Sequence, residues 1–92
     1  MDIKQCNKQL LQSAIDKWGV ELQIDMMIEE CSELITALSH MRRQRITTDE
    51  VLEELADVEI MLAQMNLIFD SASIETIKLR KLKRLAERIA CN

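Results

Sequence analysis

Two short acidic clusters contain the residues whose types and spacing could do chemistry. The first, EECSE, occupies residues 29–33, and the second, EELAD, occupies residues 53–57. In each cluster two carboxylates stand three residues apart and so project from one face of a helix: Glu30 with Glu33, and Glu54 with Asp57. Four carboxylates gathered beside an apolar stripe repel one another unless a hard cation neutralises them. The spacing therefore predicts a Mg²⁺ site, at which Mn²⁺ could substitute.

The alternative interpretation is that both clusters are solvated helix faces that form ion pairs, which is the usual place of Glu on helices. A di-iron site and a zinc site fit these ligand types less well. The single histidine, His40, does not stand three residues after any Glu, so the Glu-x-x-His motif of di-iron bundles is absent. Zinc is also poorly served, because the clusters lack the histidine and paired cysteines that it prefers.

The composition predicts an all-α fold in a single domain over residues 1–92. The chain has no Pro, one Gly and only two aromatic residues, which suits helices better than strands and tight turns. The net charge is −4, with most acid in residues 21–59 and basic residues crowded after residue 77. The acidic middle and the lack of aromatics argue against nucleic-acid binding. Three unpaired cysteines and no apolar run of membrane length favour a cytoplasmic protein without a membrane partner.

Four helices must position these clusters. Their expected ranges are 3–17, 20–43, 48–69 and 74–90. Gly19 is the residue suited to a positive-φ break, and Thr47 with Glu50 forms a capping-box pattern. Asp2 and the polar run at 70–73 offer the other caps.

The second and third helices carry a weak internal repeat with an offset of 24 residues. Apolar positions 27, 31, 34, 38 and 41 correspond to 51, 55, 58, 62 and 65, and the two acidic clusters correspond as well. Each set forms one stripe at about 100° per residue, with the carboxylates along its edge. Because the loop between the helices is short, we expect an antiparallel hairpin at the centre of a compact four-helix bundle. In that hairpin the two carboxylate pairs could converge, if the register allows it.

The two motifs, in this order and at this spacing, resemble the signature of the all-α nucleoside triphosphate pyrophosphohydrolases. That superfamily includes the MazG proteins, the dimeric dUTP pyrophosphatases and the dCTP pyrophosphatases. Trp18-Gly19 before the second helix and Gln23 shortly ahead of the first motif fit the resemblance. It covers roughly residues 15–85. The implied reaction is hydrolysis between the α and β phosphates, which releases a nucleoside monophosphate and pyrophosphate.

The resemblance also implies roles for individual residues. Glu30, Glu33, Glu54 and Asp57 would bind Mg²⁺, and Glu29 would orient or deprotonate the attacking water. Lys78 is the best match for a basic residue that holds the remaining phosphates, and Lys81 is the next. Members often have an asparagine a turn later, where this chain has Leu82, so the contacts on the phosphate side are in doubt.

Two further residues could contact the substrate, and each has a simpler alternative. Trp18 could stack on a base, although a lone Trp before a helix is more often a core anchor. Gln23 could recognise a base edge or lie exposed. His40 is interpreted as a packing or surface residue.

Apolar residues outside the main stripes, among them Ile28, Ile35 and Ile60, favour burial against another copy of the chain. The resembled family forms dimers and tetramers, and we expect a homo-oligomer, with a tetramer slightly preferred. The expected function is therefore a Mg²⁺-dependent enzyme that clears non-standard or surplus nucleotides. The alternatives are a helical interaction module and a nucleotide binder that does not hydrolyse.

Overall fold

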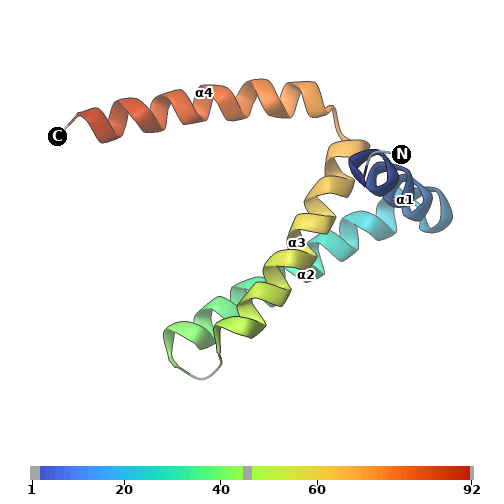
Figure 1. The fold of residues 1–92 in the computed structure, drawn as a ribbon, viewed down its shortest axis with the longest axis horizontal. Helices are drawn as coiled ribbons and strands as arrows, with labels where there is room; N and C mark the ends of the chain where they lie inside the picture. Colours follow the sequence, from blue (N-terminus) through green and yellow to red (C-terminus); the bar gives the residue numbers. More distant parts are fainter. Residues whose placement is uncertain (1–2, 45–46, 92) are drawn as a thin grey trace.

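The computed structural model describes residues 3–44 and 47–91, and all regular structure within those ranges is helical (Figure 1). The helices are α1 (Ile3–Trp18), α2 (Val20–Arg42), α3 (Thr48–Ile68) and α4 (Ser71–Ala90). The all-α prediction is therefore confirmed. The first three helices begin and end within one residue of the expected positions, and α4 begins three residues earlier than expected.

The breaks between helices have local causes. Gly19 separates α1 from α2 with a φ of 91°, a conformation that favours glycine, as the sequence predicted. Gln44 also has a positive φ, 59°, just after α2, which the sequence did not reveal. Thr47 occupies the N-cap position of α3, but its side chain makes no capping hydrogen bond to the described residues. The expected cap at Asp2 lies outside the described residues.

Asp70 explains the early start of α4. Its carboxylate accepts hydrogen bonds from the backbone N–H of Ala72, at 3.2 Å, and from the hydroxyl of Ser73. The hydrogen bond from Ser73, followed by those from the backbone, holds the pKa of Asp70 below its ordinary value of 3.8. The helix therefore begins at Ser71, directly after its cap, rather than at the first apolar residue, Ile74.

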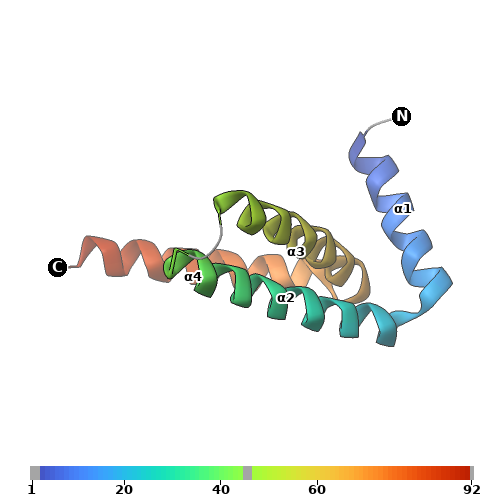
Figure 2. The same cartoon turned by 90° about the horizontal axis from the view of Figure 1, so that it is seen from below.

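The α2 and α3 helices pack side by side as an antiparallel hairpin, which is the main tertiary contact of the chain (Figures 1 and 2). Positions alternately three and four residues apart are buried or half-buried along both helices. This spacing is typical of two helices that share a seam. We call these positions the seam: Gln23, Met27, Glu30, Leu34, Ala37 and Met41 on α2, and Val51, Glu54, Val58, Met61, Met65 and Ile68 on α3.

The seam differs from the stripes that the sequence predicted. Leu38, Leu55 and Leu62 were expected in the stripe but are 39–47% exposed. Met61 and Ala37, outside the predicted stripe, are buried. Both helices are thus rotated by roughly 40° from the predicted orientation, toward their carboxylates.

The four helices do not close into a compact bundle within one copy of the chain. The α1 helix packs on α2 and α3 through Ile15, but α4 runs away from the hairpin (Figure 1). Within the described part of the chain α4 contacts only α3 and buries none of its side chains. The radius of gyration is 16.3 Å, whereas a compact domain of this length has about 12 Å. One chain is therefore more extended than a compact domain of the same length.

Across residues 3–44 and 47–91, none of the helices combines the length and the apolar character needed to cross a membrane.

Candidate metal centre

Two carboxylates occupy seam positions that would normally be apolar. Glu30 on α2 and Glu54 on α3 are both half-buried, and the Oε2 atom of each has almost no accessible surface. Neither Oε2 atom has a hydrogen-bond partner among the described residues. A buried acceptor without a partner costs free energy, so a polar group or ion is expected to complete it.

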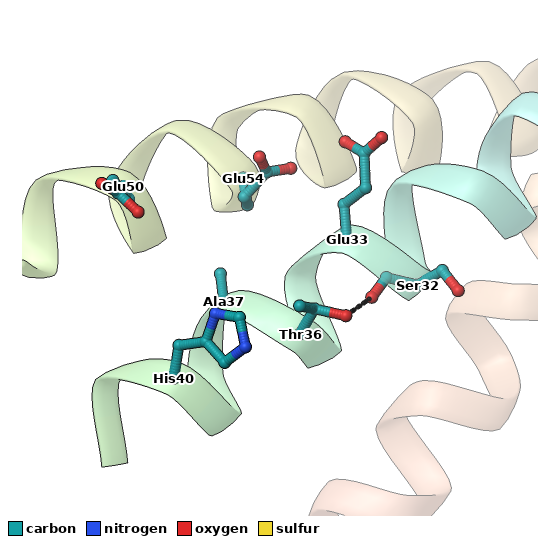
Figure 3. A pocket seen from close by; sticks show the side chains of 7 residues that line it. All are labelled: Ser32, Glu33, Thr36, Ala37, His40, Glu50 and Glu54. Carbon is teal, nitrogen blue, oxygen red and sulfur yellow. Dashed lines mark hydrogen bonds between the residues drawn. The ribbon is translucent and has the colours of Figure 1, made fainter. Parts of the chain in front are cut away.

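The hairpin brings three carboxylates together. Glu30 and Glu33 lie one turn apart on α2, and the antiparallel α3 places Glu54 beside them. One oxygen from each of the three side chains lies within 4.8 Å of the other two. Figure 3 shows Glu33 reaching from α2 toward α3, near Glu54. The convergence that the sequence left open is therefore present for these three residues.

Burial and mutual repulsion both disfavour the charged form of the two seam carboxylates. Burial raises the pKa of Glu30 above its ordinary value of 4.5, and the nearby charges of Glu33, Asp57 and Glu29 raise it further. Burial, followed by the charges of Glu33, Asp57 and Glu30, raises the pKa of Glu54 in the same way. Among the described residues the one salt bridge is between Lys78 and Glu75 on α4, so no protein cation neutralises the cluster. A bound cation would reverse this effect by favouring the ionised carboxylates.

The other two expected acidic residues lie beside this cluster. Asp57 is exposed and lies outside the three converging residues, but its charge contributes to the raised pKa of both Glu30 and Glu54. Its charge therefore adds to the repulsion within the cluster. Glu29 is exposed, and its charge contributes to the raised pKa of Glu30 but not to that of Glu54.

A groove of about 450 Å³ opens between the two helices next to the cluster (Figure 3). Its lining residues are Ser32, Glu33, Thr36, Ala37, His40, Glu50 and Glu54. The hydroxyl of Thr36 donates to the backbone carbonyl of Ser32 at 3.1 Å. His40 is the one lining residue that can become a cation, and the other ionisable groups in the lining are carboxylates.

Two residues of this groove are not predicted from the sequence. The sequence pattern indicates a capping role for Glu50 and a packing or surface position for His40. Both assignments were incomplete, because His40 and Glu50 line the groove beside Glu33 and Glu54. Helical spacing contained the signal, since His40 stands seven residues after Glu33 and Glu50 four residues before Glu54.

The remaining candidate residues are not brought to the cluster within one chain. Lys78 and Lys81 lie on α4, whose described residues contact neither α2 nor α1 and do not line the groove. Trp18 is 55% exposed, with the Lys17 ammonium 5.2 Å from its ring centre, so the preferred assignment as a core anchor is wrong for one copy. Gln23 is 5% exposed and lies in the seam, so the alternative of an exposed Gln23 is also wrong.

The donor set fits a hard divalent cation. Carboxylate oxygens from two helices, two of them buried without a partner, are the ligands that Mg²⁺ and Mn²⁺ prefer. Open positions toward the groove would leave room for water and for the oxygens of a substrate.

Comparisons with protein-family models, with curated proteins and with solved structures gave no match to this chain.

Proposed function

We propose that this chain is a Mg²⁺-dependent nucleotide pyrophosphohydrolase that converts a nucleoside triphosphate to its monophosphate and pyrophosphate. One observation supports the proposal above all others. Glu30 and Glu54 place unpartnered carboxylate oxygens in the seam of a hairpin and converge there with Glu33. Solvated helix faces would not bury carboxylates in this way, so the geometry favours a cation site over simple ion-pairing surfaces. The resemblance of the two motifs to the MazG-like superfamily supplies the reaction.

The proposed roles follow the position of each side chain. Glu30, Glu33 and Glu54 would hold the cation, with Asp57 completing the set. When bound, Mg²⁺ would screen the phosphate charges and stabilise the charge that develops on the oxygens during hydrolysis. Glu29, exposed beside the cluster, would orient or deprotonate the attacking water.

The groove is the proposed substrate site. Its volume of about 450 Å³ lies within the range of small-molecule sites. Because carboxylates dominate the lining, a polyanionic substrate would depend on the cation for its attraction. For Lys78 and Lys81, a role as phosphate ligands is supported by the resemblance alone, because α4 lies away from the groove in one chain. The proposed role is the removal of non-standard or surplus nucleotides in the cytoplasm by a homo-oligomer.

The first experiment is incubation of the purified protein with Mg²⁺ and a panel of ribo- and deoxyribonucleoside triphosphates. Monophosphate and pyrophosphate are measured directly. We expect Glu30→Gln to lower the rate by at least about a hundredfold, since it removes a proposed metal ligand. Glu53→Gln is the matched control, because Glu53 is an exposed neighbour of Glu54 and carries the same charge.

Each outcome separates the alternatives. Pyrophosphate release that Glu30→Gln abolishes and Glu53→Gln leaves intact would support the proposal. Release of diphosphate and phosphate would show that a different bond is cut. Nucleotide binding without turnover would indicate the nucleotide binder, in agreement with Leu82 at the position where the resembled family often has asparagine.

A further inference from the structure

One side of the α2–α3 hairpin is acidic, and the other side is apolar. The groove and its carboxylates lie on one side of the seam. On helical geometry, Ile28, Ile35 and Leu38 of α2 and Leu55 and Leu62 of α3 lie on the other side. We call these five residues the apolar face. All five are exposed, and Ile28 and Ile35 are 64% and 65% exposed. An apolar face of this extent on a soluble helix pair indicates a contact surface.

The α4 helix has an apolar stripe that is equally uncovered. Ile74, Leu82, Leu85 and Ile89 fall along one side of the helix, and each is at least 38% exposed. Over residues 3–44 and 47–91 no other element covers this stripe. Most of the stability of a helix in a protein comes from the packing of its apolar side, so α4 is expected to pack against another surface.

The exposed area indicates how large the missing contact is. The chain has 7581 Å² of accessible surface, whereas a compact monomer of its mass exposes about 5,500 Å². The difference, about 2,000 Å² per chain, exceeds the roughly 800 Å² that each partner contributes to an ordinary stable interface. A second copy of the chain could therefore cover both surfaces.

The charges of the hairpin and of α4 favour one of the two ways in which a second copy could pack on the first. Residues 20–68, which form the hairpin, contain eleven carboxylates and three arginines. Residues 71–90, which form α4, contain six basic residues and two glutamates. Packing hairpin against hairpin would bring two acidic units together and would leave both α4 stripes uncovered. Packing α4 on a hairpin joins opposite charges and covers both apolar surfaces in one contact.

We propose that the apolar face of each hairpin is the docking site for α4 of a second copy of this chain. The contact is reciprocal, so a twofold axis closes it without leaving an open end. A single helix can pack on two antiparallel helices that lie side by side, because its side-chain ridges fit the grooves between theirs. The acidic groove stays on the outer side, open to substrate. This inference does not depend on the proposed enzymatic function.

The test measures molar mass by light scattering and by sedimentation equilibrium across a range of protein concentrations. The full chain is expected to have at least twice its monomer mass of 10.7 kDa. The double variant Leu82→Gln/Leu85→Gln should raise the dissociation constant by about a thousandfold or more, because it removes two buried leucines from each copy. Ile28→Gln/Ile35→Gln, on the opposite half of the contact, should have a similar effect.

The control is Arg80→Gln/Arg84→Gln, which changes two residues on the far side of α4 from the stripe. Glutamine has good helix propensity, and circular dichroism verifies that α4 stays helical in every variant. A second measurement follows alkylation of Cys31, a free, half-buried thiol beside the apolar face. We expect slow alkylation in the unmodified protein and faster alkylation in both apolar variants.

Three results would overturn the proposal. The first is a monomeric unmodified chain at all concentrations, which would mean that α4 folds back on its own hairpin. The second is an oligomer that persists in Leu82→Gln/Leu85→Gln, because that would exclude α4 from the contact. The third is equal dissociation in the Arg80→Gln/Arg84→Gln control, which would show that charge alone holds the copies together.

Discussion

At the scale of single residues, Glu30 and Glu54 conflict with the stability of the hairpin that contains them. Both stand in the seam, where the neighbouring positions are Met, Val, Leu and Ala. Burial and repulsion raise the pKa of each carboxyl above 4.5. A folded protein usually keeps such residues only where function requires them, because apolar residues would pack at lower cost.

The first prediction concerns stability and pH without metal. Because the pKa of each seam carboxyl is raised in the folded state, the folded state binds protons more tightly than the unfolded state. The two carboxyls therefore contribute stability that is fully present below pH 4.5 and is lost as the pH rises through their raised pKa values. Glu30→Gln or Glu54→Gln should therefore raise the melting temperature at pH 7 in the presence of a chelator.

Added Mg²⁺ should raise the melting temperature of the unmodified protein, and more so at higher pH, but not that of either variant. Thermal denaturation between pH 4 and pH 8, with chelator or with Mg²⁺, measures both effects. Glu53→Gln serves as the exposed control and should keep the Mg²⁺ response. A lower melting temperature for Glu30→Gln in chelator would contradict the proposed conflict between charge and stability.

At the scale of helices, the seam between α2 and α3 supports the site. Glu30 and Glu54 meet because apolar seam residues on either side fix the register of the hairpin. Val51, Val58 and Met61 are buried along α3, and Ala37 is buried opposite them on α2.

The second prediction tests this support with two neighbouring residues of α3. Met61 is 6% exposed and Ile60 is 52% exposed. Met61→Ala should lower the free energy of unfolding by about 2–4 kcal/mol, because it leaves a cavity in the seam. Ile60→Ala should cost less than about 1 kcal/mol. Chemical denaturation measures both values. Equal losses of unfolding free energy in the two variants would contradict the assignment of Met61 to the seam and of Ile60 to the exposed side.

At the scale of the whole molecule, one chain is more open than a compact domain of its length. Its radius of gyration is 16.3 Å, and α4 extends away from the hairpin (Figures 1 and 2). A single copy leaves apolar residues of all four helices in water, including Trp18, Ile35, Ile60 and Leu82. Association is the direct way to remove this surface from solvent.

The third prediction is that thermal stability depends on protein concentration. If folding is coupled to association, mass action raises the melting temperature as the concentration rises. Melting curves over a hundredfold range of concentration should shift upward by several degrees. The Leu82→Gln/Leu85→Gln variant should show a smaller shift. A melting temperature that stays constant over this range would show that one copy is stable alone.

The sequence by itself determined the helices and the identity of the acidic clusters. Local features sufficed for this, because Gly19, the Asp70 cap and the 3.6-residue period act within a few positions of the chain. The carboxylate pairs could be recognised because both members of each pair lie on one turn. The short loop after α2 also sufficed to predict the antiparallel hairpin.

Only the tertiary structure decided which side of each helix forms the seam. The apolar arc of α2 is wide enough to serve two partners, and hydrophobicity alone assigned Leu38, Leu55 and Leu62 to the hairpin contact. In the structure both helices are rotated relative to that prediction. These leucines are therefore exposed, and Glu30 and Glu54 lie half-buried in the seam. The groove with His40 and Glu50 and the departure of α4 from the bundle were hidden for the same reason. Such contacts depend on how whole helices meet, and no local pattern in the chain encodes that.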